Sequence, residues 1–179
     1  IVPASSFFFF LTGITVDSPA EKNLVIKALN LLKTQYTIPP VEVHLQKCIP
    51  FGAGLGGGSA DAAFMLKLLN EFCSLNIPSD HLELMASSLG ADCPFFIRNT
   101  PVFASGIGNI FEPVTLSLNK YYLCLIKPDV SVSTPEAYSL VKPTKPEVSL
   151  KKIRATPVKV WRETMKKKKK KSVFAKRPV

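Results

Sequence analysis

The sequence predicts an α+β fold, because segments typical of strands and helices follow one another irregularly and not in the strict alternation of a doubly wound sheet. Residues 7–12 and 41–46 have the composition of strands. A glycine-rich connection then leads directly into an amphipathic helix, and further short strands follow it. The 179 residues are 46% hydrophobic and 20% charged, which is typical of a protein with a packed core.

The first half of the chain begins with a strand at 7–12, an aromatic and apolar run that stops at Gly13. Ser18-Pro19-Ala20-Glu21 has the pattern of a capping box with proline in the first turn, so a helix is expected from there to about Tyr36. Alternation of apolar and polar residues over 41–46 predicts a half-buried strand. The predicted apolar stripe of the helix comprises Leu24, Ala28, Leu31 and Leu32.

The second half is predicted to hold further helices and short strands. Helices are expected at 60–73, at 79–89 with Ser79 as cap and Gly90 as terminator, from Thr134, and from Thr156 to about Met165. Strands are expected at 94–97, 102–105, 110–114 and 121–127. The inward face of the 60–73 helix is predicted to be Ala62, Ala63, Leu66 and Leu69. A domain boundary is expected in the proline- and lysine-rich stretch 142–152, which would separate a domain at 1–141 from residues 142–179.

The charge is unevenly distributed. The formal net charge is +10, but residues 151–179 alone carry +12 and residues 1–150 carry −2. A nucleic-acid-binding protein usually spreads basic charge over a folded face, whereas here much of it lies in the run Lys166 to Lys171. Composition therefore does not favour nucleic acid as the main partner, although binding of a polyanion by the basic tail stays an alternative.

Compartment and targeting signals are sparse. The four cysteines lack C-x-x-C spacing and the two histidines complete no metal pattern, so free thiols in a reducing cytoplasm are expected. Phe7 to Leu11 is too short to span a bilayer and has no signal-peptide pattern, so no membrane association is expected. The chain begins at Ile1 and not at methionine, so we expect it to be a fragment.

The glycine-rich segment is the main functional motif. Five of the seven residues from 52 to 58 are glycine, which is more than a tight turn requires. Their value is the close approach of backbone N–H groups to a ligand, and the following helix N-terminus favours an anion. The predicted phosphate-binding residues are Pro50, Phe51, Gly52, Ala53, Gly54, Leu55, Gly56, Gly57, Gly58, Ser59 and Ala60.

Other glycine motifs fit this segment less well. A Walker A loop would need lysine at position 58, where the chain has Gly58. A dinucleotide-binding fingerprint would need an acidic residue at the end of a second strand about twenty residues on, where helix and loop are expected. A protein-kinase loop leads into a strand and not into a helix. A glycine-rich hinge stays the alternative without a ligand.

The run Gly56-Gly57-Gly58-Ser59-Ala60-Asp61 resembles the phosphate-binding motif of the GHMP kinases. Within that family it is most similar to the branch that phosphorylates the 2-hydroxyl of 4-diphosphocytidyl-2-C-methyl-D-erythritol in non-mevalonate isoprenoid biosynthesis. The resemblance covers roughly residues 15–165. Further segments that carry it, in the same order, are 23–25, 90–96, 104–108 and 127–138. It implies the N-terminal fold of that family, which is similar to a ribosomal-protein fold, followed by the start of a second α+β domain.

The resemblance also implies roles for single residues. Asp92 matches the catalytic aspartate, which would accept the proton of the substrate hydroxyl; capping of the turn before Pro94 is its alternative. Ser59 could offer its hydroxyl to Mg²⁺ or phosphate, or cap the helix. Asp61 is expected in the first helical turn, with a metal role less favoured. ATP and Mg²⁺ are the expected phosphate donor and metal.

Three residues match substrate-binding positions of the family. Lys47 would lie near the substrate diphosphate, unless it is a solvated residue at a strand end. Thr134 would bind substrate and Tyr138 would stack on the cytosine ring, unless Tyr138 is an ordinary residue of an amphipathic helix. A cytoplasmic enzyme, bacterial or plastidic, that is a monomer or weak dimer is expected.

The chain departs from the family pattern at both ends. The family's N-terminal catalytic lysine and its C-terminal glycine- and serine-rich motif are absent from these 179 residues, so little activity is expected of them alone. The alternatives are a GHMP kinase for homoserine or a mevalonate phosphate, and a nucleic-acid-binding module that uses the basic tail.

Overall fold

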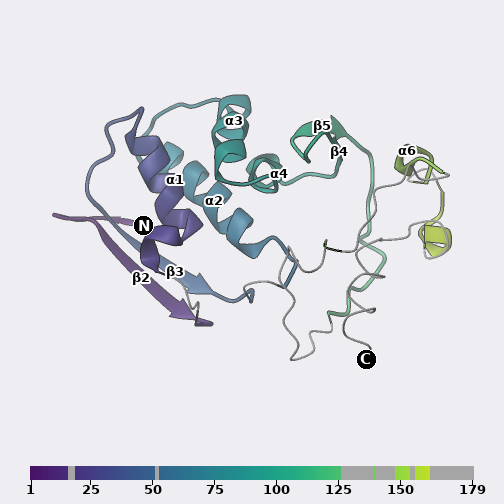
Figure 1. The fold of residues 1–179 in the computed structure, drawn as a ribbon, viewed down its shortest axis with the longest axis horizontal. Helices are drawn as coiled ribbons and strands as arrows, with labels where there is room; N and C mark the ends of the chain where they lie inside the picture. The colour runs from purple at the N-terminus through teal and green to yellow at the C-terminus, as the bar shows by residue number, and fades with distance from the viewer. Residues whose placement is uncertain (16–18, 51–52, 126–138, 140–147, 154–155, 162–179) are drawn as a thin grey trace. The chain divides into compact units, whose positions relative to one another are not determined.

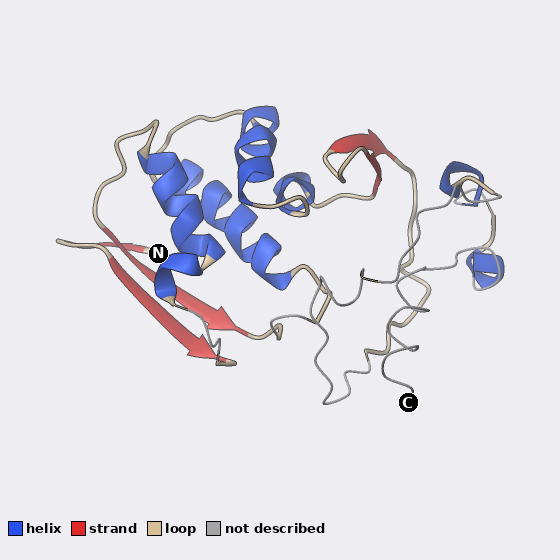
Figure 2. Cartoon of the chain, in the orientation of Figure 1, coloured by secondary structure: helices blue, strands red, loops and turns tan. Residues whose placement is uncertain are grey.

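The computed structural model describes residues 1–15, 19–50, 53–125, 139, 148–153 and 156–161. Contacts divide the chain into two compact units, Ile1–Val114 and Thr115–Val179, and each is described by itself. The first unit holds most of the described strands and helices (Figure 2). The expected boundary near 142 falls in a stretch that lies largely outside the described residues and stays a prediction.

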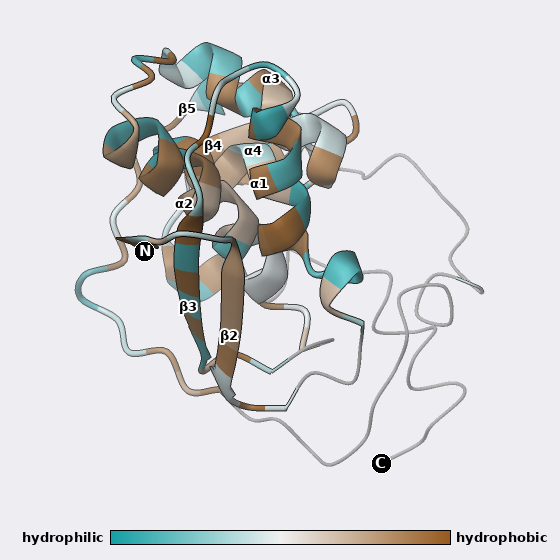
Figure 3. Cartoon of the chain, turned by 90° about the vertical axis from the view of Figure 1, so that its left-hand side faces the viewer, coloured by the Kyte–Doolittle hydropathy of each residue, from teal (hydrophilic) through white to brown (hydrophobic). Residues whose placement is uncertain are grey.

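The first unit is built on a three-stranded sheet of β1 (Val2–Pro3), β2 (Phe8–Gly13) and β3 (Val41–Lys47), in the order β1-β3-β2. β2 runs parallel to β3, and β1 runs antiparallel to it. A parallel pair needs a crossover, which is formed here by η1 (Ala20–Lys22) and α1 (Leu24–Lys33). In Figures 1 and 3, α1 and α2 lie on the same side of this sheet. The strands predicted at 7–12 and 41–46 are confirmed.

Alternation along β3 determines which side chains reach the core. Val41, Val43 and Lys47 are buried, whereas His44 is exposed. Figure 3 shows this alternation as brown and teal bands on β3. On the outer face, the ring of Phe10 stacks on His44 with 4.9 Å between centroids. The sheet therefore turns one face toward the helices, and Lys47 belongs to that face.

Helix α1 begins later than the sequence suggested. The predicted start at 18–21 is wrong, because residues 20–22 form a 3₁₀ turn and the α-helix starts at Leu24. Asn23 has extended backbone angles, and its side-chain oxygen accepts a hydrogen bond from the Val25 N–H at 3.0 Å. An N-cap of this kind satisfies a free donor of the first turn, so the helix starts there.

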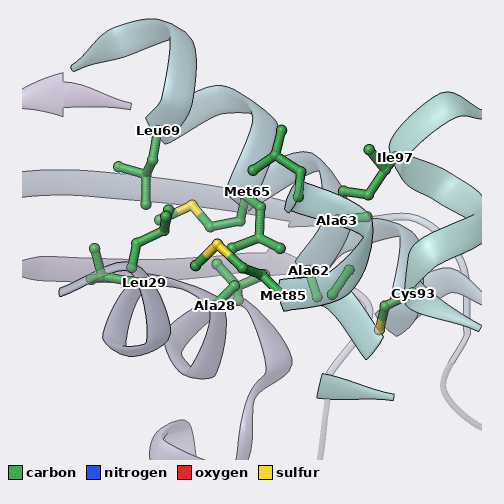
Figure 4. Close-up of a cluster of buried hydrophobic side chains, with 14 of the residues drawn as sticks. Ala28, Leu29, Ala62, Ala63, Met65, Leu69, Met85, Cys93 and Ile97 are labelled. Carbon is green, nitrogen blue, oxygen red and sulfur yellow. The ribbon is translucent and has the colours of Figure 1, made fainter. Parts of the chain in front are cut away.

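The core lies between the helices and the sheet. α2 (Gly57–Phe72), α3 (Ser79–Leu89) and α4 (Cys93–Arg98) join α1 around it. The four residues predicted to form the inward face of α2 are all fully buried. Figure 4 shows side chains from all four helices converging there. Labelled members are Ala28, Leu29, Ala62, Ala63, Met65, Leu69, Met85, Cys93 and Ile97. Ser79 is the first residue of α3 and makes no capping hydrogen bond, so its predicted role as cap is wrong.

Two strand predictions fail after α3. Residues 94–97 belong to the helix α4, because Cys93, Pro94 and Ile97 are buried on one side of it and tertiary packing overrides the strand propensity of the phenylalanines. Residues 121–125 form no strand, and none of the described strands pairs with them. The hairpin of β4 (Val102–Ser105) and β5 (Ile110–Pro113) confirms the other two predictions.

The second unit contributes two short described elements, α6 (Leu150–Ile153) and η2 (Val158–Val160). In the stretch from Thr156, where a helix is expected, Val158–Val160 form a 3₁₀ turn and Trp161 is helical; the rest of that expected helix lies outside the described residues. The helix opening at Thr134 and the run Lys166 to Lys171 also lie outside the described residues. Within the described ranges, no helix has both the length and the apolar character needed to cross a membrane.

Candidate functional site

Helix α2 begins inside the glycine run. Gly56 is its N-cap, with φ 71° and ψ 14°, and the first helical hydrogen bond runs from the Ala60 N–H to the Gly56 carbonyl at 2.8 Å. The N–H groups of Gly57, Gly58 and Ser59 precede that bond, so the helix leaves them for an anion. Ser59 is thus the third helical residue, and its predicted capping role is wrong.

Three of the glycines are required by geometry. Gly54 and Gly56 have φ of 70° and 71°, where residues with a side chain are strained. A Cβ on Gly57 would lie 2.9 Å from the Ile49 Cγ2 atom and 3.2 Å from the Lys47 Nζ atom. These constraints explain the density of glycine between 54 and 57. Phe51 and Gly52 of the predicted loop lie outside the described residues.

Asp92 and the loop line one cavity of about 360 Å³. Asp92 occupies the N-cap position of α4, but its side chain makes no capping hydrogen bond. The carboxylate is therefore not used by the helix, contrary to the capping alternative. The cavity is lined by Gly54, Gly56, Asp92, Phe95, Phe96, Val102, Ala104, Gly108 and Phe111. Its wall is thus one carboxylate, loop backbone and apolar groups.

Lys47 lies in a second cavity, of about 260 Å³. Its side chain is only 6% exposed and its ammonium pairs with the Asp61 carboxylate, so the alternative of a solvated strand-end lysine is wrong. Asp61 is the fifth residue of α2 and not part of its first turn, because the helix starts at Gly57. The cavity is lined by Phe9, Leu11, Ala20, Lys22, Asn23, Leu24, Leu45, Lys47, Gly58 and Asp61. Lys47 is not among the residues that line the Asp92 cavity.

A third hollow, of about 170 Å³, follows the loop itself. It shares Gly54 and Gly56 with the Asp92 cavity and Leu24 and Gly58 with the Lys47 cavity. Pro50, Ala53 and Ser59 also line it. The loop therefore contributes residues to both cavities as well as to its own hollow.

Ser59 connects α2 to α4. Its hydroxyl is hydrogen-bonded to the buried Cys93 thiol. Burial raises the pKa of Cys93 above its usual 9.0; the Ser59 hydrogen bond opposes this shift and the nearby Asp92 charge adds to it. Among the described residues, no group of three His, Cys, Asp or Glu side chains could hold a metal. The contact of Ser59 with Mg²⁺ stays a prediction.

Sequence reasoning did not identify several lining residues. Asn23 precedes an apolar periodic run and could have been recognised as a cap. The burial of Lys47 follows from the same alternation that buries Val41 and Val43, so the sequence could also have predicted that Lys47 is buried. The contribution of Phe96 depends on tertiary packing of α4, which no local pattern indicated. Thr134 and Tyr138 lie outside the described residues, and their substrate roles stay predictions.

The comparisons with known proteins agree on one family. Residues 23–100 match the model of the GHMP kinases N terminal domain. A protein of Parabacteroides distasonis named 4-diphosphocytidyl-2-C-methyl-D-erythritol kinase is 67% identical over 179 residues, which are 100% of this chain and 66% of that protein. One of the same name from Bacteroides fragilis is 54% identical over 173 residues, which are 97% of this chain and 63% of that protein.

A solved structure agrees. A crystal structure of 4-(cytidine 5'-diphospho)-2C-methyl-D-erythritol kinase has a TM-score of 0.71 and 27% identity, and the match covers 99% of this chain and 64% of that one. The chain thus spans about two thirds of the length of these relatives. The mixed sheets and helices of the first unit confirm the predicted α+β class. The chain belongs to the GHMP kinase family and contains its N-terminal domain.

Proposed function

We propose that the protein containing this chain transfers the γ-phosphate of ATP to the 2-hydroxyl of 4-diphosphocytidyl-2-C-methyl-D-erythritol, a step of isoprenoid biosynthesis. The names of the relatives suggest the substrate. One structural observation supports the chemistry: Asp92, whose side chain makes no capping hydrogen bond, lines the same cavity as two residues of the glycine loop, Gly54 and the α2 N-cap Gly56. A phosphate donor on the loop and an acceptor hydroxyl beside Asp92 would meet there.

ATP is assigned to the loop and the Lys47 cavity. The first N–H groups of α2 favour the phosphates, since the positive end of the helix dipole lies there. Gly58 lines both the loop hollow and the Lys47 cavity, so a nucleotide with its phosphates on the loop can place its base in that cavity. Apolar walls with a few polar groups, among them Asn23, suit a planar base.

Asp92 is assigned as the proton acceptor. As the acceptor oxygen bonds to the γ-phosphorus, its proton passes to the Asp92 carboxylate and ADP leaves. Phe95 and Phe111 give much of the remaining cavity wall an apolar character.

The protein groups near the loop are compatible with an Mg²⁺ ion that binds together with the triphosphate. When bound, it would neutralise phosphate charge, and such ions keep several water ligands and use few protein groups. Ser59 can offer a hydroxyl in the loop hollow, whereas the Asp61 carboxylate is already paired with Lys47.

Thr134 and Tyr138 are proposed to bind the acceptor substrate by holding its cytidine. For Lys47, its place in the cavity across the loop from Asp92 favours contact with ATP over the expected contact with the acceptor diphosphate. We also propose a cytoplasmic bacterial enzyme, since these relatives are bacterial, acting as a monomer or weak dimer without nucleic acid.

A substrate panel on the gene product that contains this chain tests the proposal. ATP is offered with the cytidylated methylerythritol, homoserine, mevalonate or phosphomevalonate, and ADP release is measured. Turnover of the first compound alone is expected, and preference for another would assign another branch of the family.

Asp92→Asn should lower kcat by about 10²–10⁴-fold. The matched change Asp80→Asn, at an exposed acid in the first turn of α3, should leave kcat unchanged. Normal turnover by Asp92→Asn would contradict the role given to Asp92.

A further inference from the structure

Lys47 is the one charged side chain that is buried among the described residues. It is 6% exposed, and its partner Asp61 is 25% exposed. A buried ammonium needs a partner, because an isolated charge in the interior is costly. The pair joins the end of β3 to the second turn of α2, across fourteen positions of sequence.

The position of the ammonium is set by the phosphate loop as well as by Asp61. The Lys47 Nζ atom lies 3.2 Å from the place that a Cβ on Gly57 would occupy, so it lies beside the first turn of α2. Lys47, Asp61 and Gly58 together line the 260 Å³ cavity. The positive charge is thus held between that cavity and the N–H groups assigned to the phosphates.

We infer that Asp61 is a positioning residue, which holds the Lys47 ammonium beside the first turn of α2 for a nucleoside triphosphate bound along the loop. This inference rests on the proposed function. The Lys47 side chain is long and has many rotamers, and Asp61 selects the one that keeps the charge at the loop. Because its carboxylate is engaged by Lys47, Asp61 acts through that residue and not as a ligand of the nucleotide.

The test is a double-mutant cycle in the gene product that contains this chain. Asp61→Asn, Lys47→Met and the double variant are compared for the Kd of Mg·ATP by calorimetry, for the KM of the acceptor, and for Tm. Asp61→Asn and Lys47→Met should each weaken ATP binding roughly tenfold, and the double variant should bind ATP no more weakly than Lys47→Met alone. The acceptor KM should change less than about twofold, since Lys47 does not line the Asp92 cavity.

Glu83→Gln is the matched control. Glu83 is 20% exposed and pairs with Arg98 between α3 and α4, so the change breaks a similar ion pair away from the cavity. It should leave the Kd of ATP unchanged. A fall in Tm for Asp61→Asn with an unchanged Kd of ATP would reduce the pair to a structural role and overturn the inference.

The double variant keeps the test informative if Asp61→Asn does not fold, because it leaves no buried charge unpaired. Recovery of its Tm, with ATP binding equal to that of Lys47→Met, supports the inference. Weaker binding than Lys47→Met, or equal loss of Tm in single and double variants, overturns it. Intact ATP binding without phosphorylation of the cytidylated acceptor would reject the proposed function but not the pairing.

Discussion

Replacing Gly56 by alanine is expected to destabilise the protein more than the same change at Gly54, although the two residues have nearly the same φ. Both alanines would have to adopt the left-handed region. The difference lies in the surroundings: a Cβ on Gly54 meets nothing within 4 Å, whereas one on Gly56 would lie 2.9 Å from the Phe96 Cζ atom. Gly54→Ala therefore isolates backbone strain, and Gly56→Ala adds a collision.

The expected losses follow from these two costs. Left-handed backbone costs an alanine about 1–2 kcal/mol, which is the whole effect predicted for Gly54→Ala. Overpacking against an aromatic ring adds about 1–3 kcal/mol, so Gly56→Ala should lose about 2–5 kcal/mol in all. Because Phe96 lines the Asp92 cavity, its displacement should also raise the acceptor KM. The ATP affinity should change similarly in both variants.

Urea denaturation followed by circular dichroism measures the stability difference, provided that the m-value stays constant. Adding Phe96→Leu to Gly56→Ala should recover most of the extra loss, because the shorter side chain withdraws the colliding ring atom. Equal stability of the two alanine variants would refute the reasoning, as would a Gly56→Ala variant that Phe96→Leu does not rescue. Either result would mean that Phe96 does not pack on the loop.

The remaining predictions concern the frame around the site. Asn70→Ala should lower the free energy of unfolding, measured by urea denaturation, by about 1–3 kcal/mol. The Asn70 side-chain amide accepts a hydrogen bond from the Ile77 N–H at 2.9 Å and donates one to the Ile77 carbonyl at 3.0 Å, and the two backbone groups of Ile77 would lose this partner. An unchanged denaturation midpoint would contradict this prediction. Burial raises the pKa of Cys93, so the folded protein holds the thiol proton more tightly than the unfolded chain does. The stability that this group contributes is therefore fully present below about pH 9.0 and is lost as the pH rises. Cys93→Ala should flatten that alkaline decline, and an identical slope would exclude the thiol as its source.

Local patterns predicted the parts of the fold whose signals are local. The alternation in β3 and the apolar face of α2 each reflect burial on one side of a regular element, so the sequence carries them directly. Residues 94–97 show the limit. Their aromatic composition favours a strand, but burial of Pro94 and Ile97 against neighbouring helices makes a helix, and that packing is set by distant residues.

In the candidate site, too, local features could be predicted from the sequence and long-range ones could not. The loop was predicted because glycine density and a following helix are local features, whereas the pairing of Lys47 with Asp61 joins two elements that only the folded chain brings together. The start of α2 was placed three residues late because glycine disfavours helix, and Gly57 and Gly58 do not look helical in sequence. A helix turn made of glycine is nevertheless what lets a ligand approach its backbone closely.

The arrangement of the two cavities gives the loop a direction. The residues shared with the Lys47 cavity include Gly58, and those shared with the Asp92 cavity are Gly54 and Gly56. A triphosphate whose base lies beside Lys47 would therefore extend along the loop toward Asp92, with its terminal phosphate nearest the carboxylate. The reverse orientation would place a nucleobase beside Asp92 and the terminal phosphate beside the paired Asp61, far from an uncommitted proton acceptor. Under the proposed function, only the first orientation would use the Asp92 carboxylate, which makes no capping hydrogen bond, for chemistry and the Asp61 carboxylate, which is paired with Lys47, for holding a cation. The proposal therefore places phosphoryl transfer at the Asp92 end of the loop.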